Sequence, residues 1–193
     1  MRVVSGELRG RRLLAAPGRE TRPTSDRAKA GLFDWIGPRV AGARVLDLFA
    51  GTGALGIEAL SRGAREAVFV ERSRGALRAL RRNLDELALG ERARVLERDL
   101  ARGLGPLAAA DERFDLVLAD PPYEDSALAA PLALLVSGQL LAPAATVVVE
   151  RSRRHPLPAV AGLVSHGSRR YGDTELEWLG PGEPPADEGE RSA

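Results

Sequence analysis

The sequence predicts an α/β protein built on a mostly parallel sheet, with helices covering both faces in a Rossmann-like arrangement. From residue 43 onward, short apolar segments alternate with segments of helical periodicity, which is the pattern of consecutive βα units. A glycine-rich turn, Gly51-Thr52-Gly53-Ala54-Leu55-Gly56, follows the first strand and opens a helix. Five predicted strands end at or near an acidic residue: Asp47, Glu71, Asp99, Asp120 and Glu150. Because parallel strands bring their carboxyl ends to one edge, these acids predict a ligand site along that edge.

A short extension precedes the first βα unit. Residues 2–14 alternate loosely between apolar and polar positions, which predicts a small β-hairpin. Residues 24–26 offer N-cap candidates for a helix that ends at Gly37-Pro38. The apolar face of that helix is formed by Ala28, Leu32, Phe33 and Ile36.

Seven strands are expected in the sheet. The predicted parallel strands are residues 44–48, 67–71, 93–99, 114–120 and 145–150, and an antiparallel terminal hairpin is predicted at 160–170 and 174–179. Helices are expected from residue 54 to 62, from 73 to about 87 and from 128 to 135. Ser73 is the expected cap of the second of these helices.

The chain divides into three predicted parts. Residues 1–40 form a basic hairpin and helix extension, residues 41–180 the main domain, and residues 181–193 an acidic tail that is expected to be disordered. Residues 1–30 carry eight basic and three acidic side chains, although the whole chain has a net charge of +1. Such a cluster suits a polyanion. The candidate contacts are Arg9, Arg11, Arg12, Arg22 and Arg27.

Composition excludes several kinds of chemistry. The chain has no cysteine, so disulfides, thiolate catalysis and Cys-ligated zinc are excluded. It has only two histidines, and no metal site is expected. We find neither a membrane-spanning apolar stretch nor an N-terminal signal region, and therefore expect a cytoplasmic protein.

The tetrapeptide Asp120-Pro121-Pro122-Tyr123 follows the fourth strand without a linker. The Asp120 carboxylate and the Pro121 carbonyl can each accept one hydrogen of an amino group, and Tyr123 offers a ring face for stacking. Prolines fix φ and donate no hydrogen bond, so the turn is stiff and its carbonyl stays available. These features predict a platform for the exocyclic amine of a nucleobase. The alternative is an ordinary exit from a strand, in which Asp and Pro are common turn residues.

The glycine pattern with Glu71, twenty residues after Gly51, also matches a dinucleotide-binding fingerprint. A nicotinamide or flavin enzyme is therefore an alternative. Asp47, four residues before Gly51, favours instead a cofactor with a cationic amino-acid end. S-adenosylmethionine has such an end, together with a ribose diol for Glu71 and an adenine amine for Asp99.

Several motifs together resemble the RsmD family of bacterial methyltransferases, which act on guanine N2 in 16S ribosomal RNA. The glycine turn with its preceding Asp47-Leu48-Phe49-Ala50 and the tetrapeptide at residue 120 are typical of class I methyltransferases that modify exocyclic amines. The flanking motifs narrow the resemblance to RsmD over residues 1 to about 179: Arg9-Gly10-Arg11, residues 22–27, residues 55–64 and Tyr171-Gly172-Asp173-Thr174.

The resemblance implies a role for each matching residue. The implied base-binding and catalytic residues are Asp120, Pro121, Pro122 and Tyr123. The implied S-adenosylmethionine site comprises Asp47, Phe49, Ala50, Gly51, Gly53, Glu71, Arg72, Asp99 and Leu100. The implied partner is 16S ribosomal RNA, within a small-subunit particle or an assembly intermediate.

Two alternatives remain open from the residues alone. DNA adenine-N6 methyltransferases share the tetrapeptide, although they usually carry a target-recognition insert for which this chain has no room. A non-catalytic RNA-binding module on the same fold is the other alternative, but such a module has no use for the acidic edge and the glycine turn.

Overall fold

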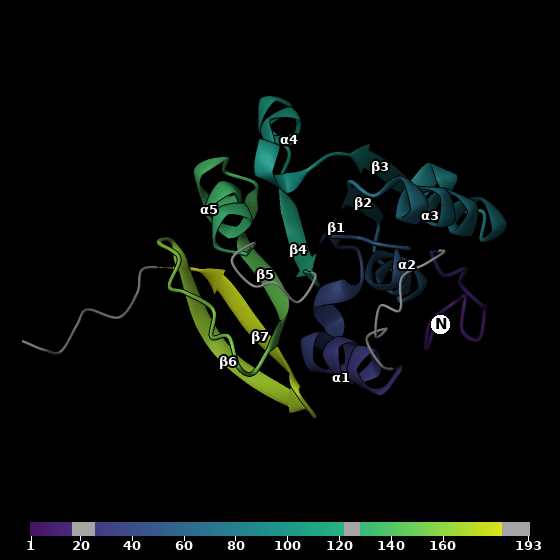
Figure 1. The fold of residues 1–193 in the computed structure, drawn as a ribbon, viewed down its shortest axis with the longest axis horizontal. Coiled ribbons are helices and arrows are strands. Elements are labelled where there is room, and N and C mark those ends of the chain that lie inside the picture. Colours follow the sequence, from purple (N-terminus) through teal and green to yellow (C-terminus); the bar gives the residue numbers. More distant parts are fainter. Residues whose placement is uncertain (17–25, 122–127, 183–193) are drawn as a thin grey trace, which may run out of the picture.

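A seven-stranded sheet forms the centre of the structure, a computed structural model that describes residues 1–16, 26–121 and 128–182 (Figure 1). The strands are β1 (Arg44–Leu48), β2 (Glu66–Glu71), β3 (Ala93–Glu97), β4 (Phe114–Ala119), β5 (Leu141–Ser152), β6 (Leu163–Tyr171) and β7 (Thr174–Pro181). Their order is β3-β2-β1-β4-β5-β7-β6. Strands β1 to β5 run parallel, and β7 is antiparallel to both β5 and β6. This confirms the predicted mostly parallel sheet with an antiparallel terminal hairpin.

Helices cover both faces of the sheet. They are α1 (Asp26–Ile36), α2 (Ala54–Ser61), α3 (Arg74–Glu86), α4 (Gly105–Ala109) and α5 (Ala129–Ser137), with 3₁₀ turns at Gly37–Val40, Gly90–Arg92 and Leu100–Arg102. Successive strand residues point to opposite faces. In β1, Val45 therefore joins the apolar cluster of α1, α2 and α3, whereas Leu46 joins that of α4 and α5. Figure 1 shows these two helix layers on either side of the strands.

Several predicted strand boundaries were wrong, and those of β5 and β3 have a visible physical reason. Strand β5 begins at Leu141 rather than residue 145, because Phe114 pairs with Leu141 before the register shifts. The intervening Ala-Pro-Ala-Ala segment has low β-propensity, so a local pattern does not reveal this pairing. Strand β3 ends at Glu97 rather than residue 99. Asp99 instead accepts a hydrogen bond from the amide of Ala101 at 3.1 Å and starts a 3₁₀ turn.

The predicted N-terminal hairpin is present in a short form, with an antiparallel bridge between Arg2 and Arg12 and a backbone hydrogen bond from Val3 to the carbonyl of Arg11 at 2.9 Å. Much of the hydrogen bonding of this segment goes to α2. The buried Glu58 carboxylate accepts the amides of Val4 at 2.7 Å and Ser5 at 2.9 Å. Residues 1–16, called the N-terminal arm below, thus pack directly on the main domain.

Gly6 fixes how closely the N-terminal arm approaches α2. Its φ is +83°, and a Cβ built there would lie 1.8 Å from the carbonyl oxygen of Ser61. Ser61 Oγ also accepts the amide of Leu8 at 2.9 Å and donates to the carbonyl of Ser5 at 2.6 Å. A side chain at position 6 would therefore push the arm away from α2. The N-cap candidates Thr24 and Ser25 lie outside the described residues, as does the predicted tail from residue 183.

Candidate active site

The carboxyl ends of β1, β2 and β4 meet along one rim of the sheet. Leu48, the last residue of β1, pairs with Val70 of β2 and with Ala119 of β4. The next residues along these three strands therefore lie along the rim in the order Glu71, Phe49 and Asp120. This rim is the edge at which ligands bind in open α/β sheets.

The first half of the predicted base platform lies on this rim. Asp120 is partly exposed and Pro121 is buried. Ala119 pairs with Val149 of β5, so Asp120 is also in register with Glu150. Glu150 is a buried residue within β5, which continues to Ser152. Pro122 and Tyr123, the other half of the platform, lie outside the described residues.

The turn after β1 has an unusual backbone. The φ angle is +60° at Phe49, +56° at Gly51 and +86° at Gly53. A positive φ is uncommon for a residue other than glycine, and for an aromatic residue it costs conformational energy that the surroundings must offset. The amide of Ala50 donates to the carbonyl of Val70 at 3.0 Å, and the amide of Gly53 to the carbonyl of Ala50 at 2.7 Å. These bonds hold a strained turn on the rim.

The three glycines of the turn have different roles. Among the residues that the structure describes, a Cβ at Gly51 would meet no atom closer than 3.9 Å, so these residues leave the space beside it open. A Cβ at Gly53 would lie 2.5 Å from Leu80 of α3, and one at Gly56 would lie 2.3 Å from Phe69 of β2. Gly53 and Gly56 are thus required by packing within the protein. Only Gly51 presents a bare Cα to open space.

Asp47 lies beneath this turn and not beside the open space. Its side chain is 1% exposed, and its carboxylate accepts the amide of Gly56 at 2.8 Å. Burial raises the pKa of Asp47 to about 8, with smaller contributions in the same direction from Asp120 and Glu71, while the Gly56 bond lowers it. This contact joins Asp47 to the start of α2, and the predicted contact of its carboxylate with the cationic end of the cofactor stays a prediction.

Glu71 joins the turn to the end of β2. One carboxylate oxygen accepts the amide of Gly51 at 2.8 Å, and the other accepts those of Arg72 at 2.8 Å and Ser73 at 2.7 Å. A carboxylate has about four acceptor positions, so about one remains for a ligand hydroxyl. Ser73 occupies the N-cap position of α3 without a capping side-chain bond. Glu71 thus bonds the backbone at the start of α3, where the Ser73 side chain was predicted to act.

The third predicted cofactor contact lies after β3. Arg72 Nη1 lies 3.0 Å from Asp99 Oδ2, while Asp99 Oδ1 accepts the amide of Ala101 at 3.1 Å. The Ala101 bond and then the Arg72 bond hold the pKa of Asp99 below its usual value. Leu100 is buried beside them. Asp99 therefore stays ionised and can accept a hydrogen bond from a ligand amine.

The predicted RNA-contacting arginines are largely exposed. Arg9, Arg11 and Arg12 lie on the surface of the N-terminal arm, and Arg27 on that of α1. Arg11 Nη2 donates to the carbonyl of Glu86 at 3.1 Å. Arg22 lies outside the described residues.

Two basic residues near the N-terminus, buried Lys29 and exposed Arg2, already have acidic partners within the protein. Lys29 is 1% exposed, and its Nζ lies 3.3 Å from Glu58 and donates to the carbonyl of Arg2 at 2.6 Å. Arg2 pairs with Asp26 at 2.8 Å. The positive surface of this region is therefore smaller than the count of basic residues in its sequence indicates.

Sequence reasoning missed Asn83 in α3. Its side chain is 1% exposed and accepts the amide of Leu14 at 2.8 Å. It also donates to the carbonyls of Thr52 at 2.9 Å and Leu14 at 3.3 Å. Asn83 thereby connects the N-terminal arm to the glycine turn. Its position next to Leu84, on the apolar stripe of α3, was the available signal, because buried amides nearly always have hydrogen-bond partners.

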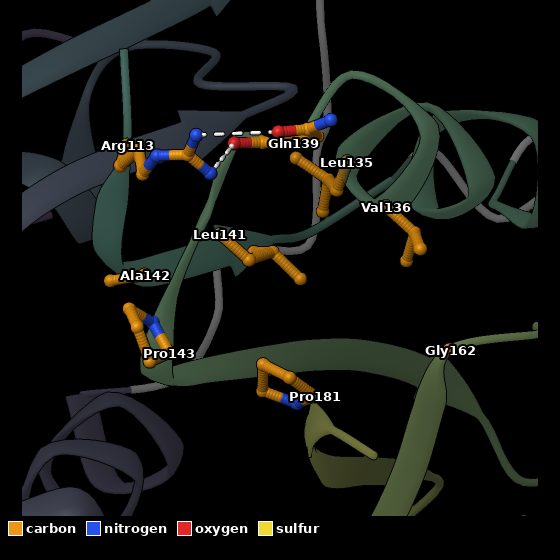
Figure 2. A pocket seen from close by; sticks show the side chains of 9 residues that line it. All are labelled: Arg113, Leu135, Val136, Gln139, Leu141, Ala142, Pro143, Gly162 and Pro181. Atoms are coloured by element: carbon orange, nitrogen blue, oxygen red, sulfur yellow. Dashed lines mark hydrogen bonds between the residues drawn. The ribbon is translucent and has the colours of Figure 1, made fainter. Parts of the chain in front are cut away.

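A separate hollow of about 310 Å³ lies at the opposite edge of the sheet, near the starts of β4 and β5. Figure 2 shows Arg113 reaching Gln139 beside Leu141 and Pro181, and Arg113 Nη1 donates to the Gln139 carbonyl at 2.8 Å. This hollow is remote from the rim. Within residues 1–16, 26–121 and 128–182, no acidic, histidine or cysteine cluster could hold a metal ion, and no helix is long and apolar enough to cross a membrane.

Comparison with known proteins gives consistent matches. Residues 1–179 match the family described as "Conserved hypothetical protein 95". The "Putative rRNA methyltransferase YlbH" of Bacillus subtilis is 42% identical over 175 residues, which cover 90% of this chain and 95% of that protein. The "Ribosomal RNA small subunit methyltransferase D" of Escherichia coli K12 is 37% identical over 160 residues, covering 83% of this chain and 79% of that one. The structure titled "Putative methyltransferase yhhF from Escherichia coli" superposes with a TM-score of 0.82 at 33% identity, covering 95% of this chain and 99% of that one.

Proposed function

The chain belongs to the family described as conserved hypothetical protein 95, in agreement with the RsmD resemblance of its motifs, and on this premise we propose that it methylates the exocyclic N2 amine of a guanine in 16S ribosomal RNA. It is an S-adenosylmethionine-dependent ribosomal RNA methyltransferase. The choice of guanine N2, the roles of individual residues and the form of the substrate particle are parts of the proposal.

The rim has features that fit S-adenosylmethionine. Gly51 leaves open space where a Cβ would otherwise stand, and Glu71 retains about one acceptor position for a ribose hydroxyl. Asp99, held ionised by Ala101 and Arg72, suits the adenine amine. When bound, S-adenosylmethionine supplies a methyl group on a positively charged sulfur.

Asp120 and Pro121 would orient the acceptor base. The lone pair of a guanine amine is delocalised into the ring, so this nitrogen is a poor nucleophile. Accepting one N–H at the Asp120 carboxylate and the other at the Pro121 carbonyl favours a pyramidal nitrogen with a localised lone pair. With S-adenosylmethionine bound, its methyl carbon would be the electrophile toward which Asp120 and Pro121 direct this lone pair, and the electron pair of the broken carbon–sulfur bond would remain on sulfur. Asp120 is the group of the tetrapeptide that can accept the proton released by nitrogen.

Positioning and electrostatics would supply most of the rate acceleration. The target base must leave its stack to reach a platform at the end of β4, and Tyr123 is proposed to replace the original stacking. The observation that carries the proposal is the register of the rim, which places Asp120 beside the end of β1 and its glycine turn, with Glu71 on the other side of β1.

The proposal is tested with small-subunit particles from a bacterial strain that lacks the enzyme. The purified protein is incubated with these particles and a labelled methyl donor, and the product is analysed as nucleosides. We expect label in N2-methylguanosine. Label in N6-methyladenine of DNA, offered in competition, would instead support the DNA alternative. Donor binding without transfer to either substrate would support a non-catalytic module.

A further inference from the structure

Both tryptophans of the chain meet at one place on the surface. Trp35 of α1 and Trp178 of β7 form an edge-to-face pair with ring centroids 5.7 Å apart. The Arg39 guanidinium lies 4.5 Å from the centre of the Trp178 ring, and that of Arg169 lies 5.1 Å from Trp35. His166 is 5.7 Å from Trp178. These five residues are called the Trp–Arg patch below.

The patch is positively charged and accessible. Arg39, Arg169 and His166 are exposed, and both tryptophans are partly exposed. Among residues 1–16, 26–121 and 128–182, no carboxylate lies within ion-pair distance of Arg39 or Arg169, whereas Arg151 of β5 and Arg170 of β6 pair with Glu175. The charges of Arg39 and Arg169 are thus not neutralised within the described protein, and a partner with negative charge fits them.

We propose that the Trp–Arg patch is a second contact surface for the RNA substrate, on which unpaired nucleotides outside the target site stack. Unpaired bases stack on aromatic rings and on the planar guanidinium of arginine, and the same arginines attract phosphates. This inference rests on the proposed function, since it assigns the surface to the same RNA.

The position of the patch is compatible with a substrate bound at the rim. Arg169 of β6 pairs with Leu176 of β7, which pairs with Glu150 of β5, the residue in register with Asp120. Three strand spacings separate β4 from β6, so Arg169 and Asp120 are roughly 15 Å apart along the rim. The N-terminal arm lies near the other end of α1, where Arg2 pairs with Asp26. The 11 residues of α1 span about 16 Å. An RNA that reaches both ends of α1 would be held on both sides of the target base.

The tryptophans provide a direct probe. Because the chain has no other tryptophan, its tryptophan fluorescence reports only on the patch. The wild-type protein is titrated with 16S ribosomal RNA transcribed in vitro, and separately with particles from a strain lacking the enzyme. We expect the RNA alone to quench this fluorescence, in parallel with binding measured by filter retention.

Matched variants separate the patch from general charge. Arg39→Ala with Arg169→Ala should weaken RNA binding and raise the KM for RNA by about tenfold, the size expected for removing one stacked base. The kcat and the affinity for S-adenosylmethionine should not change. Arg78→Ala with Arg82→Ala removes the same charge from the exposed side of α3, at the other end of the sheet. This control should leave the fluorescence response unaltered. Arg39→Lys with Arg169→Lys keeps the charge without the planar group, and should give an intermediate affinity with a wild-type salt dependence.

The outcomes distinguish this inference from the proposed function. Absence of methylation at N2 with the wild-type protein would refute the proposed function, whatever the patch variants do. Normal methylation with an unchanged KM in the Arg39, Arg169 alanine variant would refute the patch as an RNA surface. A fluorescence response to particles but not to the transcribed RNA would assign the patch to a ribosomal protein and likewise overturn the inference.

Discussion

The Asp47 carboxylate lies 2.8 Å from the amide nitrogen of Gly56 and is buried beneath the turn that connects β1 to α2. A Cβ at Gly56 would stand 3.0 Å from this carboxylate and 2.3 Å from Phe69. The close approach of α2 to the sheet therefore depends on both residues. Asp47 supports the glycine turn from inside, and its protonation is linked to folding.

The first prediction concerns the pH dependence of stability. Burial raises the pKa of Asp47 to about 8, whereas the carboxyl group of the unfolded chain ionises near pH 4. Between these values the folded protein holds a proton that the unfolded chain has released. The free energy of unfolding should thus fall as pH rises from about 4 to about 8, by up to about 1.4 kcal/mol per pH unit from this group. Asp47→Asn keeps an acceptor for Gly56 but does not titrate. Urea unfolding across this range should show a shallower decline in Asp47→Asn, and equal slopes would contradict the assignment.

The second prediction concerns Glu71 and the cofactor. Glu71→Ala should weaken S-adenosylmethionine binding by about 1–3 kcal/mol, the range for removing a hydrogen bond to a charged group. Glu71→Gln retains one acceptor oxygen and should have a smaller effect. Glu97→Ala, a surface carboxylate on the adjacent strand, serves as the control. If calorimetric titration shows the same S-adenosylmethionine affinity in Glu71→Ala as in the wild-type protein, Glu71 does not bind the cofactor.

The third prediction separates chemistry from binding at the rim. Asp120→Ala should abolish methyl transfer and leave cofactor affinity nearly intact, because Asp120 is assigned to the base. Asp120→Asn should retain partial activity, since an amide oxygen still accepts an N–H. Asp115→Ala, at the other end of β4, should not affect kcat, because Asp115 bonds the amide of Arg44 on the opposite edge. If Asp120→Ala turns over normally, the tetrapeptide is only a turn.

The alternation of strands and helices predicted most of the fold, because apolar segments of β1, β2 and β4 are buried on both faces and form continuous runs in the sequence. The rim was predicted by the same pattern, since the topology places Glu71 and Asp120 on either side of the glycine turn that follows β1. The contact of Asp47 with Gly56 could not be predicted from the sequence. The position of Asp47 four residues before Gly51 does not determine whether its carboxylate faces a ligand or the protein interior. The pairing of Phe114 with Leu141 at the start of β5 likewise could not be predicted from the sequence around either residue.

Lys29 shows a further limit of sequence reasoning. It belongs to the basic cluster of residues 1–30 by its position in the chain, and only the packing of α1 on α2 reveals that it is buried against Glu58. Burial lowers the pKa of Lys29, although the nearby Glu58 carboxylate acts in the opposite direction. A count of charges along the chain cannot distinguish such a residue from one on the surface.

The fourth prediction concerns the exposed arginines of the N-terminal arm. Replacing Arg9, Arg11 and Arg12 with alanine should weaken RNA binding and reduce its salt dependence, by about 0.7–0.9 in log–log slope for each phosphate that the protein no longer neutralises. Cofactor affinity should be unchanged, because no hydrogen bond or ion pair of the described residues joins these side chains to the glycine turn. A triple variant with a wild-type salt slope and normal turnover would show that these arginines contribute only to solubility.

The last prediction concerns the connection made by Asn83. Asn83→Ala leaves the Thr52 carbonyl and the backbone of Leu14 without their partner, and each unsatisfied buried group costs about 1–3 kcal/mol. We expect a lower free energy of unfolding together with weaker S-adenosylmethionine binding, because Thr52 lies between Gly51 and Gly53 in the turn.

Ser61→Ala is the matched control, since Ser61 holds the same arm through Leu8 and Ser5 without contacting the turn. Both variants should be less stable in urea unfolding, but only Asn83→Ala should have a reduced cofactor affinity in calorimetric titration. Equal cofactor affinities in the two variants would mean that Asn83 anchors the N-terminal arm but does not affect the cofactor site. A selective reduction in Asn83→Ala would mean that cofactor binding and the attachment of the arm are coupled through one buried amide.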